Sequence, residues 1–267
     1  MKRLPLSFFL WVFALSAPFW LLAAMTDRQL MPGLSVSALM TFCPLMAALI
    51  LVHREDGAAG VTRLLRRSFD FKRIASVRWF APILLVMPGV SLVVYGLMLW
   101  MGLPVPAPQF SWLAALLMFF AFFIAALGEE LGWSGYALDP LQDRWTAMTA
   151  SVVLGAVGIL WHIVPLLLLH RPPAWIAWWC LYAMAARVVM VWLFNHTGKS
   201  VFAVALFHAT LNLSYMLFPV SGSHFDMRLG GVVMAFAAAA LVVLWGPQAF
   251  ARSRAAEPGA GPEPSKP

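Results

Sequence analysis

Charged residues are scarce in this chain. They make up 11% of its 267 residues, whereas 62% of the residues are apolar. An ordinary soluble domain has about a quarter of its residues charged, so this composition excludes that class. The mean hydropathy is +0.83, and apolar runs recur from one end of the chain to the other. The sequence therefore predicts a polytopic membrane protein.

Cysteine is almost absent too. Cys43 and Cys180 are the two cysteines, and each lies inside an apolar run. Their separation fits neither a disulfide framework nor a metal site, so we interpret both as packing residues.

Apolar runs long enough to cross a bilayer, which takes roughly 20 helical residues, define the predicted fold. They lie at about 6–24, 34–52, 79–102, 111–128, 147–169, 174–194, 201–218 and 229–246. We predict an all-α transmembrane bundle of about eight spans in one domain, residues 1–246, with the first run retained rather than cleaved as a signal peptide. The Pro-, Gly- and Ala-rich tail, 247–267, is expected to be disordered.

Basic residues predict the orientation. The formal charge is +7, but the basic residues fall in short loops instead of one stripe, which argues against a nucleic-acid partner. Eight spans put both termini on one side. If the termini are on the inner side of the membrane, the outer segments hold only three basic residues, Arg28, Arg171 and Arg228. Arg187 lies within a span, and all other Lys and Arg residues lie on the inner side. The positive-inside rule then predicts an integral protein of the cell (inner) membrane with both termini in the cytoplasm.

Two adjacent carboxylates interrupt the apolar character of the fourth run. Glu129 and Glu130 lie in GEELGWSGYALDP, where each charged group would cost about 2.5–3.5 kcal/mol at the centre of a span. They could instead lie hydrated at the inner interface. Helix-compatible residues continue to Asp139, however, so we expect both glutamates inside a helix. Neighbours on a helix point about 100° apart, so the two carboxylates are expected to have different tasks.

Polar groups of a complementary kind occur in two other spans. GILWHIVP places His162 three residues before Pro165, a residue that can kink a helix. FHATLNLS places His208 and Asn212 four residues apart, on one helical face. A desolvated carboxylate suits a general base that takes a proton from water, and His208 with Asn212 could donate hydrogen bonds to an oxyanion. The set predicts a peptidase that activates water.

At these residues the sequence resembles the CPBP family, the CAAX-protease and bacteriocin-processing group also called Abi, which includes the Rce1-type prenyl-protein peptidases. The family pattern is EExxxR, then FxxxH, then HxxxN, each on its own transmembrane helix. Here EELGWS occupies 129–134, GILWH 158–162 and HATLN 208–212, within a core of about 111–216. The resemblance implies a glutamate-dependent intramembrane endopeptidase. In it, Glu129 and His162 activate water, Glu130 assists, and His208 and Asn212 form the oxyanion site.

Two residues depart from the family pattern. The family phenylalanine is Gly158, which we interpret as permitting closer helix packing. The family arginine is Ser134, so Glu130 loses a cation on its own helix. Either Glu130 shares a proton with Glu129, or Arg187 supplies the missing charge. Alternatively, Arg187 extends its charged end to the inner interface.

Other classes of protein remain open at this point. Ser134 lies in GWSG and could be the nucleophile of a rhomboid-like serine protease. Zinc could bind Glu129, His162 and His208, although HExxH is absent; we predict no cofactor and no metal. A non-catalytic immunity or peptide-sequestering module, or a proton-coupled transporter, is a further alternative. The predicted partners are the bilayer and a membrane-anchored peptide or protein substrate, whose identity the sequence does not give; nor does it give the oligomeric state.

Overall fold

The computed structural model describes residues 5–26, 29–31, 34–220 and 222–249. Its α-helices are α1 (Leu6–Thr26), α2 (Cys43–Arg66), α3 (Phe80–Trp100), α4 (Trp112–Gly132), α5 (Leu138–Gln142), α6 (Ala147–Leu168), α7 (Pro173–His196), α8 (Val201–Met216) and α9 (Met227–Ala249). The predicted all-helical transmembrane bundle is confirmed, and the chain is an integral membrane protein. Beyond residue 249 the predicted tail lies outside the described residues.

Short elements join the helices. The antiparallel pair β1 (Gln29–Met31) and β2 (Leu34–Ser35) precedes the 3₁₀ helix η1 (Val36–Phe42). Two more 3₁₀ helices, η2 (Arg67–Arg73) and η3 (Val77–Trp79), connect α2 to α3, and a π-helix, η4 (Trp133–Ala137), connects α4 to α5. The predicted span at 34–52 is therefore displaced: a hairpin strand occupies its start, and the helical part runs on to the basic end of α2.

Seven helical segments in the described part of the chain are long and apolar enough to cross a membrane. The seventh predicted span, 201–218, is shorter than expected, because α8 ends at Met216 after 16 residues. Pro219 explains this end, since a proline disfavours helical conformation at the residue before it. At 16 residues, α8 is shorter than the roughly 20 residues of a typical membrane span.

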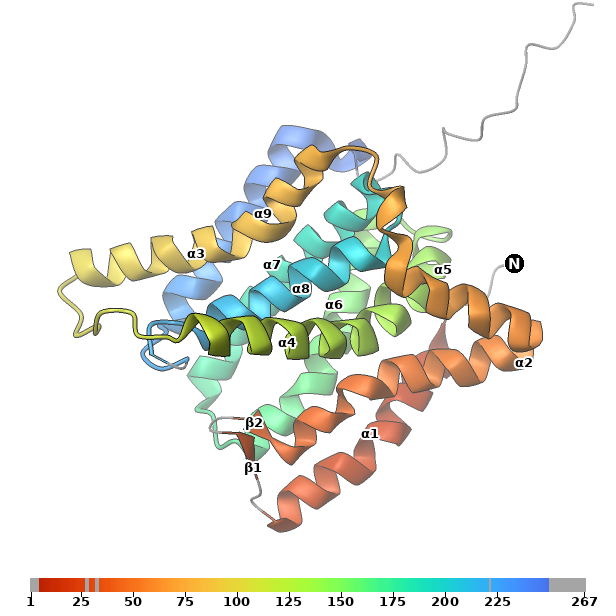
Figure 1. Ribbon diagram of the computed structural model, residues 1–267, viewed down its shortest axis with the longest axis horizontal. Coiled ribbons are helices and arrows are strands. Elements are labelled where there is room, and N and C mark those ends of the chain that lie inside the picture. The colour runs from red at the N-terminus through yellow and green to blue at the C-terminus, as the bar shows by residue number, and fades with distance from the viewer. Residues whose placement is uncertain (1–4, 27–28, 32–33, 221, 250–267) are drawn as a thin grey trace, which may run out of the picture.

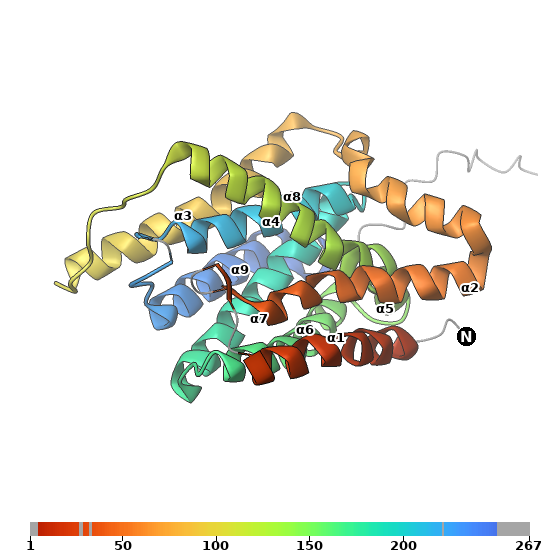
Figure 2. The same cartoon turned by 60° about the horizontal axis from the view of Figure 1, so that its bottom comes forward.

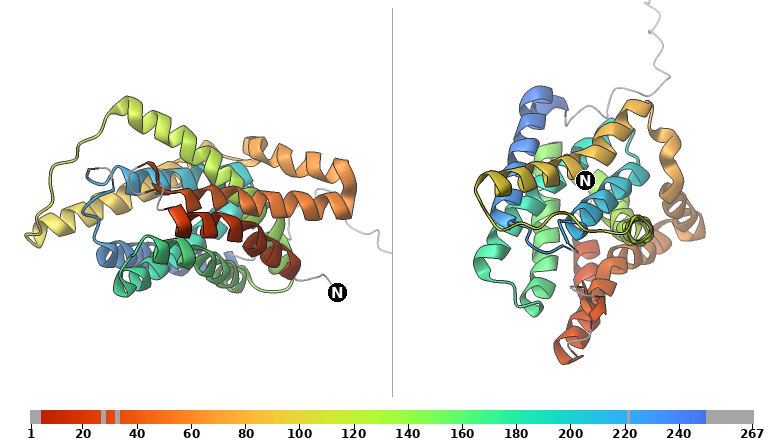
Figure 3. Two further views of the ribbon diagram at one scale, coloured as in Figure 1. Left: turned by 90° about the horizontal axis from the view of Figure 1, so that it is seen from below. Right: turned by 60° about the vertical axis from the view of Figure 1, so that its left-hand side comes forward.

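The helices pack around α7 and α8. In Figure 1, α4 lies between α2 and α8, while α3 and α9 lie on the opposite side of α8. Figure 2 shows α1 alongside α6, and Figure 3 shows α1 and α2 (red and orange) side by side at one flank of the bundle. Helix α7 has the largest buried share of the apolar segments, 61%, which marks it as the central helix. The candidate site can thus draw side chains from several helices around α7.

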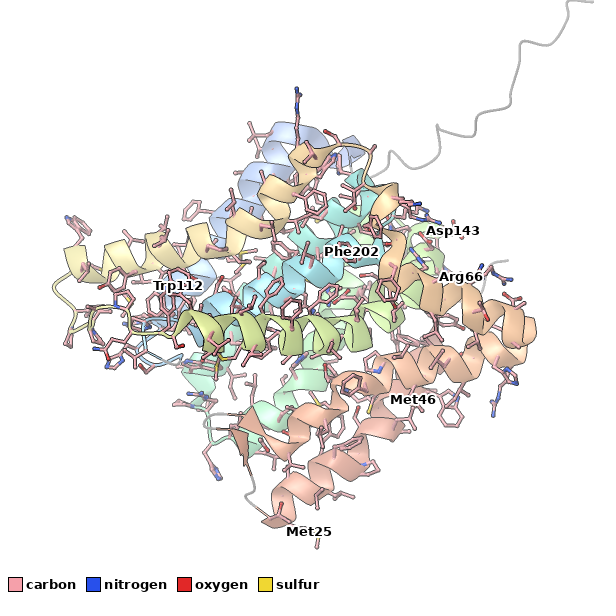
Figure 4. The ribbon with its side chains drawn as sticks, viewed as in Figure 1. Met25, Met46, Arg66, Trp112, Asp143 and Phe202 are labelled. Atoms are coloured by element: carbon pink, nitrogen blue, oxygen red, sulfur yellow. The ribbon has the colours of Figure 1, made fainter. Side chains whose placement is uncertain are left out.

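Apolar side chains cover the outside of the bundle. In Figure 4 the labelled Met25 and Trp112 lie at its periphery, and they are 83% and 81% exposed. Continuous apolar exposure of this kind marks a membrane-facing surface. Two polar residues, Arg66 and Asp143, are labelled on the right-hand side of the same view.

The η2 segment fastens α8 to the end of α4. Asp70 accepts hydrogen bonds from the Ser200 hydroxyl and from the backbone N–H groups of Val201 and Phe202, so it caps the start of α8. The Arg67 guanidinium donates to the carbonyl oxygens of Gly135 in η4 and Lys199 before α8, at 2.8 and 2.7 Å. These bonds fix the relative placement of the two helices that carry most of the predicted site residues.

Candidate active site

Glu129 and Glu130 lie in the interior of one helical segment. Helix α4 continues through the π-helix η4 into α5, giving a segment of 31 residues from Trp112 to Gln142. Glu129 is near the middle of this segment, 7% exposed, and Glu130 is fully buried. The expectation that the helix continues past the glutamates is confirmed. π-Helical turns are frequent at functional sites, and this one begins three residues after Glu130.

A cavity of about 130 Å³ lies inside the bundle beside Glu129. Four of the predicted residues line it: Glu129 from α4, His162 from α6, and His208 and Asn212 from α8. Aromatic and apolar side chains form much of the remaining wall, among them Trp133, Ile159, Trp179, Tyr182 and Leu211. The fold therefore brings together residues that are up to 83 positions apart, the separation between Glu129 and Asn212.

Glu130 does not line the cavity and is held by three side chains. Arg187 donates from both terminal nitrogens, to Oε2 at 3.1 Å and to Oε1 at 3.2 Å. His208 Nδ1 lies 3.1 Å from Oε1, and the Ser134 hydroxyl donates to Oε2. Arg187, itself 9% exposed, therefore replaces the absent family arginine, and the alternative in which it extends to the interface is wrong. These partners also replace the expected proton sharing with Glu129.

The hydrogen bonds of the two histidines define their free nitrogens. His162 Nδ1 lies 2.8 Å from the carbonyl oxygen of Gly158, which can only accept, so Nδ1 carries the hydrogen. In a neutral ring Nε2 is then an acceptor. The ring packs edge-on against Trp161, with centroids 4.6 Å apart, and Trp161 donates to Ser16 of α1 at 2.7 Å. His162 thus has a fixed orientation beside the cavity.

His208 is oriented by Glu130. An ionised carboxylate accepts from Nδ1–H, which leaves Nε2 for the cavity. With Nδ1 donating to Glu130, Nε2 can donate a second hydrogen bond only when the ring is an imidazolium. The carboxylate of Glu130 therefore fixes the orientation of the His208 ring beside the cavity.

Glu129 has a partner that sequence reasoning missed. The Thr41 hydroxyl, at the end of η1, lies 3.0 Å from Glu129 Oε1 and 3.2 Å from the carbonyl oxygen of Ala125. Tyr182 in the cavity wall was missed as well. Neither residue belongs to a motif, and their approach to the site depends on how separate helices pack.

Gly158 does not serve closer helix packing, and that expectation is wrong. A Cβ atom placed there would meet no heavy atom within 4 Å, and the residue lines the cavity. The glycine leaves open the space that a phenylalanine would occupy. Close approach occurs instead at Gly132, where a Cβ would lie 2.5 Å from the backbone of Pro44. Helix α6 continues past Pro165 to Leu168.

Ser134 and the zinc alternative find little support in the geometry. Ser134 is 1% exposed, does not line the cavity, and donates its hydroxyl hydrogen to Glu130. In the described residues, no group of three or more His, Cys, Asp and Glu side chains is arranged to hold a metal ion. Serine catalysis would require the Ser134 hydroxyl to face the cavity. A three-ligand metal centre would require three His, Cys, Asp or Glu side chains to converge on one point.

A carboxylate, two imidazoles and an amide around one cavity inside an apolar bundle define a class: a membrane-embedded hydrolase. Residues 110–214 match the family described as type II CAAX prenyl endopeptidase Rce1-like. The chain is also 25% identical over 235 residues to CAAX prenyl protease 2 of Methanococcus maripaludis, covering 83% of this chain and 82% of that protein. The resemblance seen in the motifs is confirmed: the chain is similar to Rce1-like CAAX proteases, which supports a protease, and the matched region contains every predicted catalytic residue.

Proposed function

We propose that the protein hydrolyses a peptide bond of a membrane-associated protein or peptide, with Glu129 as the general base. The observation that carries this proposal is the shared cavity: Glu129, His162, His208 and Asn212 line it together, although they come from three helices. The carboxylate lies where a water molecule and a scissile carbonyl group can both reach it. General bases must stand within hydrogen-bond reach of the proton that they take.

The steps follow from these positions. Glu129 takes one proton from water while the water oxygen bonds to the carbonyl carbon of the scissile peptide. Nε2 of His162 accepts a hydrogen bond from the other O–H group of this water molecule and so holds the water oxygen in line with the carbonyl carbon. The tetrahedral intermediate then collapses, the C–N bond breaks, and Glu129 returns its proton to the leaving nitrogen. Water is consumed, and a carboxylic acid and an amine are formed; the acid then loses its proton to the amine, which gives a carboxylate and an ammonium group.

The oxyanion of the intermediate requires donors on the α8 side. His208 donates from Nε2 and Asn212 from its side-chain amide, two groups one helical turn apart on the same face. Removing one such donor typically costs about 10²- to 10³-fold in kcat. Glu130 is a positioning residue in this scheme, since it holds His208 and is neutralised by Arg187. No metal or cofactor takes part in it.

The substrate is proposed from the name of the relative and the position of the cavity. The Methanococcus maripaludis protein is named a CAAX prenyl protease, so a prenylated carboxyl-terminal peptide is the first substrate to test. Bacteriocin-like or other membrane-anchored peptides are the next. We further propose a place in the cell membrane with both termini in the cytoplasm, as the distribution of basic residues predicts.

The test is cleavage of fluorogenic, membrane-anchored peptides by purified protein in liposomes. The panel pairs prenylated and unprenylated peptides of the same sequence and is run with and without a metal chelator. We expect cleavage by the wild type that the chelator leaves unchanged and that Glu129→Gln abolishes. Loss on chelation would favour zinc chemistry. A folded wild type that cleaves no peptide of the panel would favour a non-catalytic module or a transporter, and proton-coupled flux in the same liposomes would identify the latter.

A further inference from the structure

We infer that Thr41 is a positioning residue for Glu129, holding one carboxylate oxygen so that the other faces the cavity. The inference rests on the proposed role of Glu129 as general base. Thr41 lies 88 positions before Glu129, outside the matched region, which begins at residue 110. It belongs to the end of η1, where the chain enters α2.

Two glycines of α4 allow Thr41 to come this close. A Cβ atom at Gly128 would lie 3.0 Å from the carbonyl oxygen of Thr41 and 2.7 Å from the ring of Phe42. At Gly132, one turn further on, a Cβ would lie 2.5 Å from the backbone of Pro44. Small residues four apart on a membrane helix let a second backbone approach closely. The Gly128 and Gly132 face of α4 therefore receives η1 and the start of α2 directly beside Glu129.

The Thr41 hydroxyl suits a carboxylate that gains and loses a proton. Its hydrogen has two acceptors in reach, Glu129 Oε1 at 3.0 Å and the Ala125 carbonyl oxygen at 3.2 Å. Oε1 can accept this hydrogen bond when Glu129 is ionised, and also when Oε2 has taken the proton from water. The bond to Thr41 thus persists through the cycle. It restricts the rotation of the carboxyl group and leaves Oε2 for water.

A hydrogen bond such as that from Thr41 to Glu129 affects kcat by holding the reacting carboxylate in position. A misplacement of about 1 Å in a reacting group can cost 10²-fold, and side chains that carry such groups need supporting hydrogen bonds to stay in place. Removing the hydroxyl should therefore lower kcat and leave KM largely unchanged. A purely structural role for Thr41 would instead lower stability, without a selective effect on kcat.

The experiment compares Thr41→Val, which keeps the shape of the side chain, with Thr41→Ser, which keeps the hydroxyl. Wild type, both variants and Glu129→Gln are measured for kcat, KM and thermal unfolding in the same liposomes. We expect Thr41→Val to lose about 10- to 100-fold in kcat with KM within about threefold, and Thr41→Ser to restore most of it. Thr62→Val is the matched control, since Thr62 is exposed and donates to the carbonyl oxygen of Ala58 within its own helix.

The outcomes separate this inference from the proposed function. An inactive Glu129→Gln together with a fully active Thr41→Val would overturn the role of Thr41 and leave that of Glu129 intact. An active Glu129→Gln would overturn the proposed function and, with it, the inference. A Thr41→Val variant that loses activity only in proportion to folded protein, and is not rescued by serine, would also overturn the positioning role. Gly128→Ala offers a second route, because it forces η1 away and should lower kcat in the same way.

Discussion

The two adjacent glutamates of α4 occupy opposite environments. Glu129 lines the cavity and takes a hydrogen bond from the neutral hydroxyl of Thr41. Glu130, one residue further on, is fully buried and bound by Arg187, His208 and Ser134. The turn of about 100° per residue in a helix separates two identical side chains into two tasks. The cavity side keeps its carboxylate available for a proton, whereas the buried side uses its carboxylate to fix a cation and a histidine.

The largest expected effect is on the cavity side. Glu129→Gln keeps the shape but cannot take a proton from water, and general base catalysis contributes about 10²- to 10⁴-fold. We expect kcat for peptide cleavage in liposomes to fall about 10³-fold. Glu55→Gln is the matched control, because Glu55 does not line the cavity and accepts an exposed hydrogen bond from Tyr136, so this variant should retain full activity. Cleavage by Glu129→Gln within tenfold of wild type would remove the distinction between the two glutamates.

The next effect is on the buried side. Arg187→Gln leaves the charge of Glu130 without its ion-pair partner, which costs about 3–5 kcal/mol for a buried pair. The thermal unfolding temperature should therefore fall strongly, and the cleavage activity should fall with it. Arg63→Gln is the control, since Arg63 pairs with Asp56 at the surface and such pairs are worth about 1 kcal/mol or less.

A double variant sharpens the same comparison. Glu130→Gln with Arg187→Gln removes both charges, so its loss of stability should be clearly smaller than the sum of the two single losses. Activity should remain low, because the neutral amide that replaces the carboxylate binds His208 Nδ1 less strongly. Strict additivity of the two stability losses would show that Arg187 and Glu130 are not coupled.

A smaller loss is expected on the oxyanion side of the cavity. Asn212→Ala removes one proposed donor and should lower kcat by about 10²-fold with a modest change in KM. A rise in KM with kcat unchanged would mean that Asn212 only binds the substrate.

The size of the cavity can be changed at Gly158. A phenylalanine there would fill space that now borders His162, so cleavage of peptides with a bulky residue beside the scissile bond should fall by about tenfold relative to peptides with a small one. Gly96→Phe is the control, because a Cβ atom at Gly96 on α3 would also meet no heavy atom within 4 Å, but this glycine does not line the cavity. An equal loss of cleavage for large and small peptides would show that the cavity beside Gly158 does not select the substrate.

The smallest effect is expected from Ser134→Ala. The variant loses one of several hydrogen bonds to Glu130, and we expect activity within about fivefold of wild type, since a single such bond contributes on the order of 1 kcal/mol. Complete loss in this variant would revive the serine-protease alternative.

Much of the fold and of the site could be predicted from the sequence. Apolar runs predicted the helices, and the motifs at Glu129, His162 and His208 predicted the residues around the cavity. Periodicity shows which residues share a face of one helix, but not how two helices are rotated against each other. For this reason Thr41 was missed, and the partner of Arg187 remained one of two alternatives. The length of α8 was overestimated because hydropathy ignored the proline at 219.

The most direct test of the central claim measures Glu129→Gln and Glu130→Gln side by side, each for thermal unfolding and for peptide cleavage in the same liposomes. The division of tasks predicts that Glu129→Gln unfolds at nearly the wild-type temperature and is inactive, whereas Glu130→Gln unfolds at a clearly lower temperature. Equal stability losses in the two variants, or an active Glu129→Gln, would contradict it.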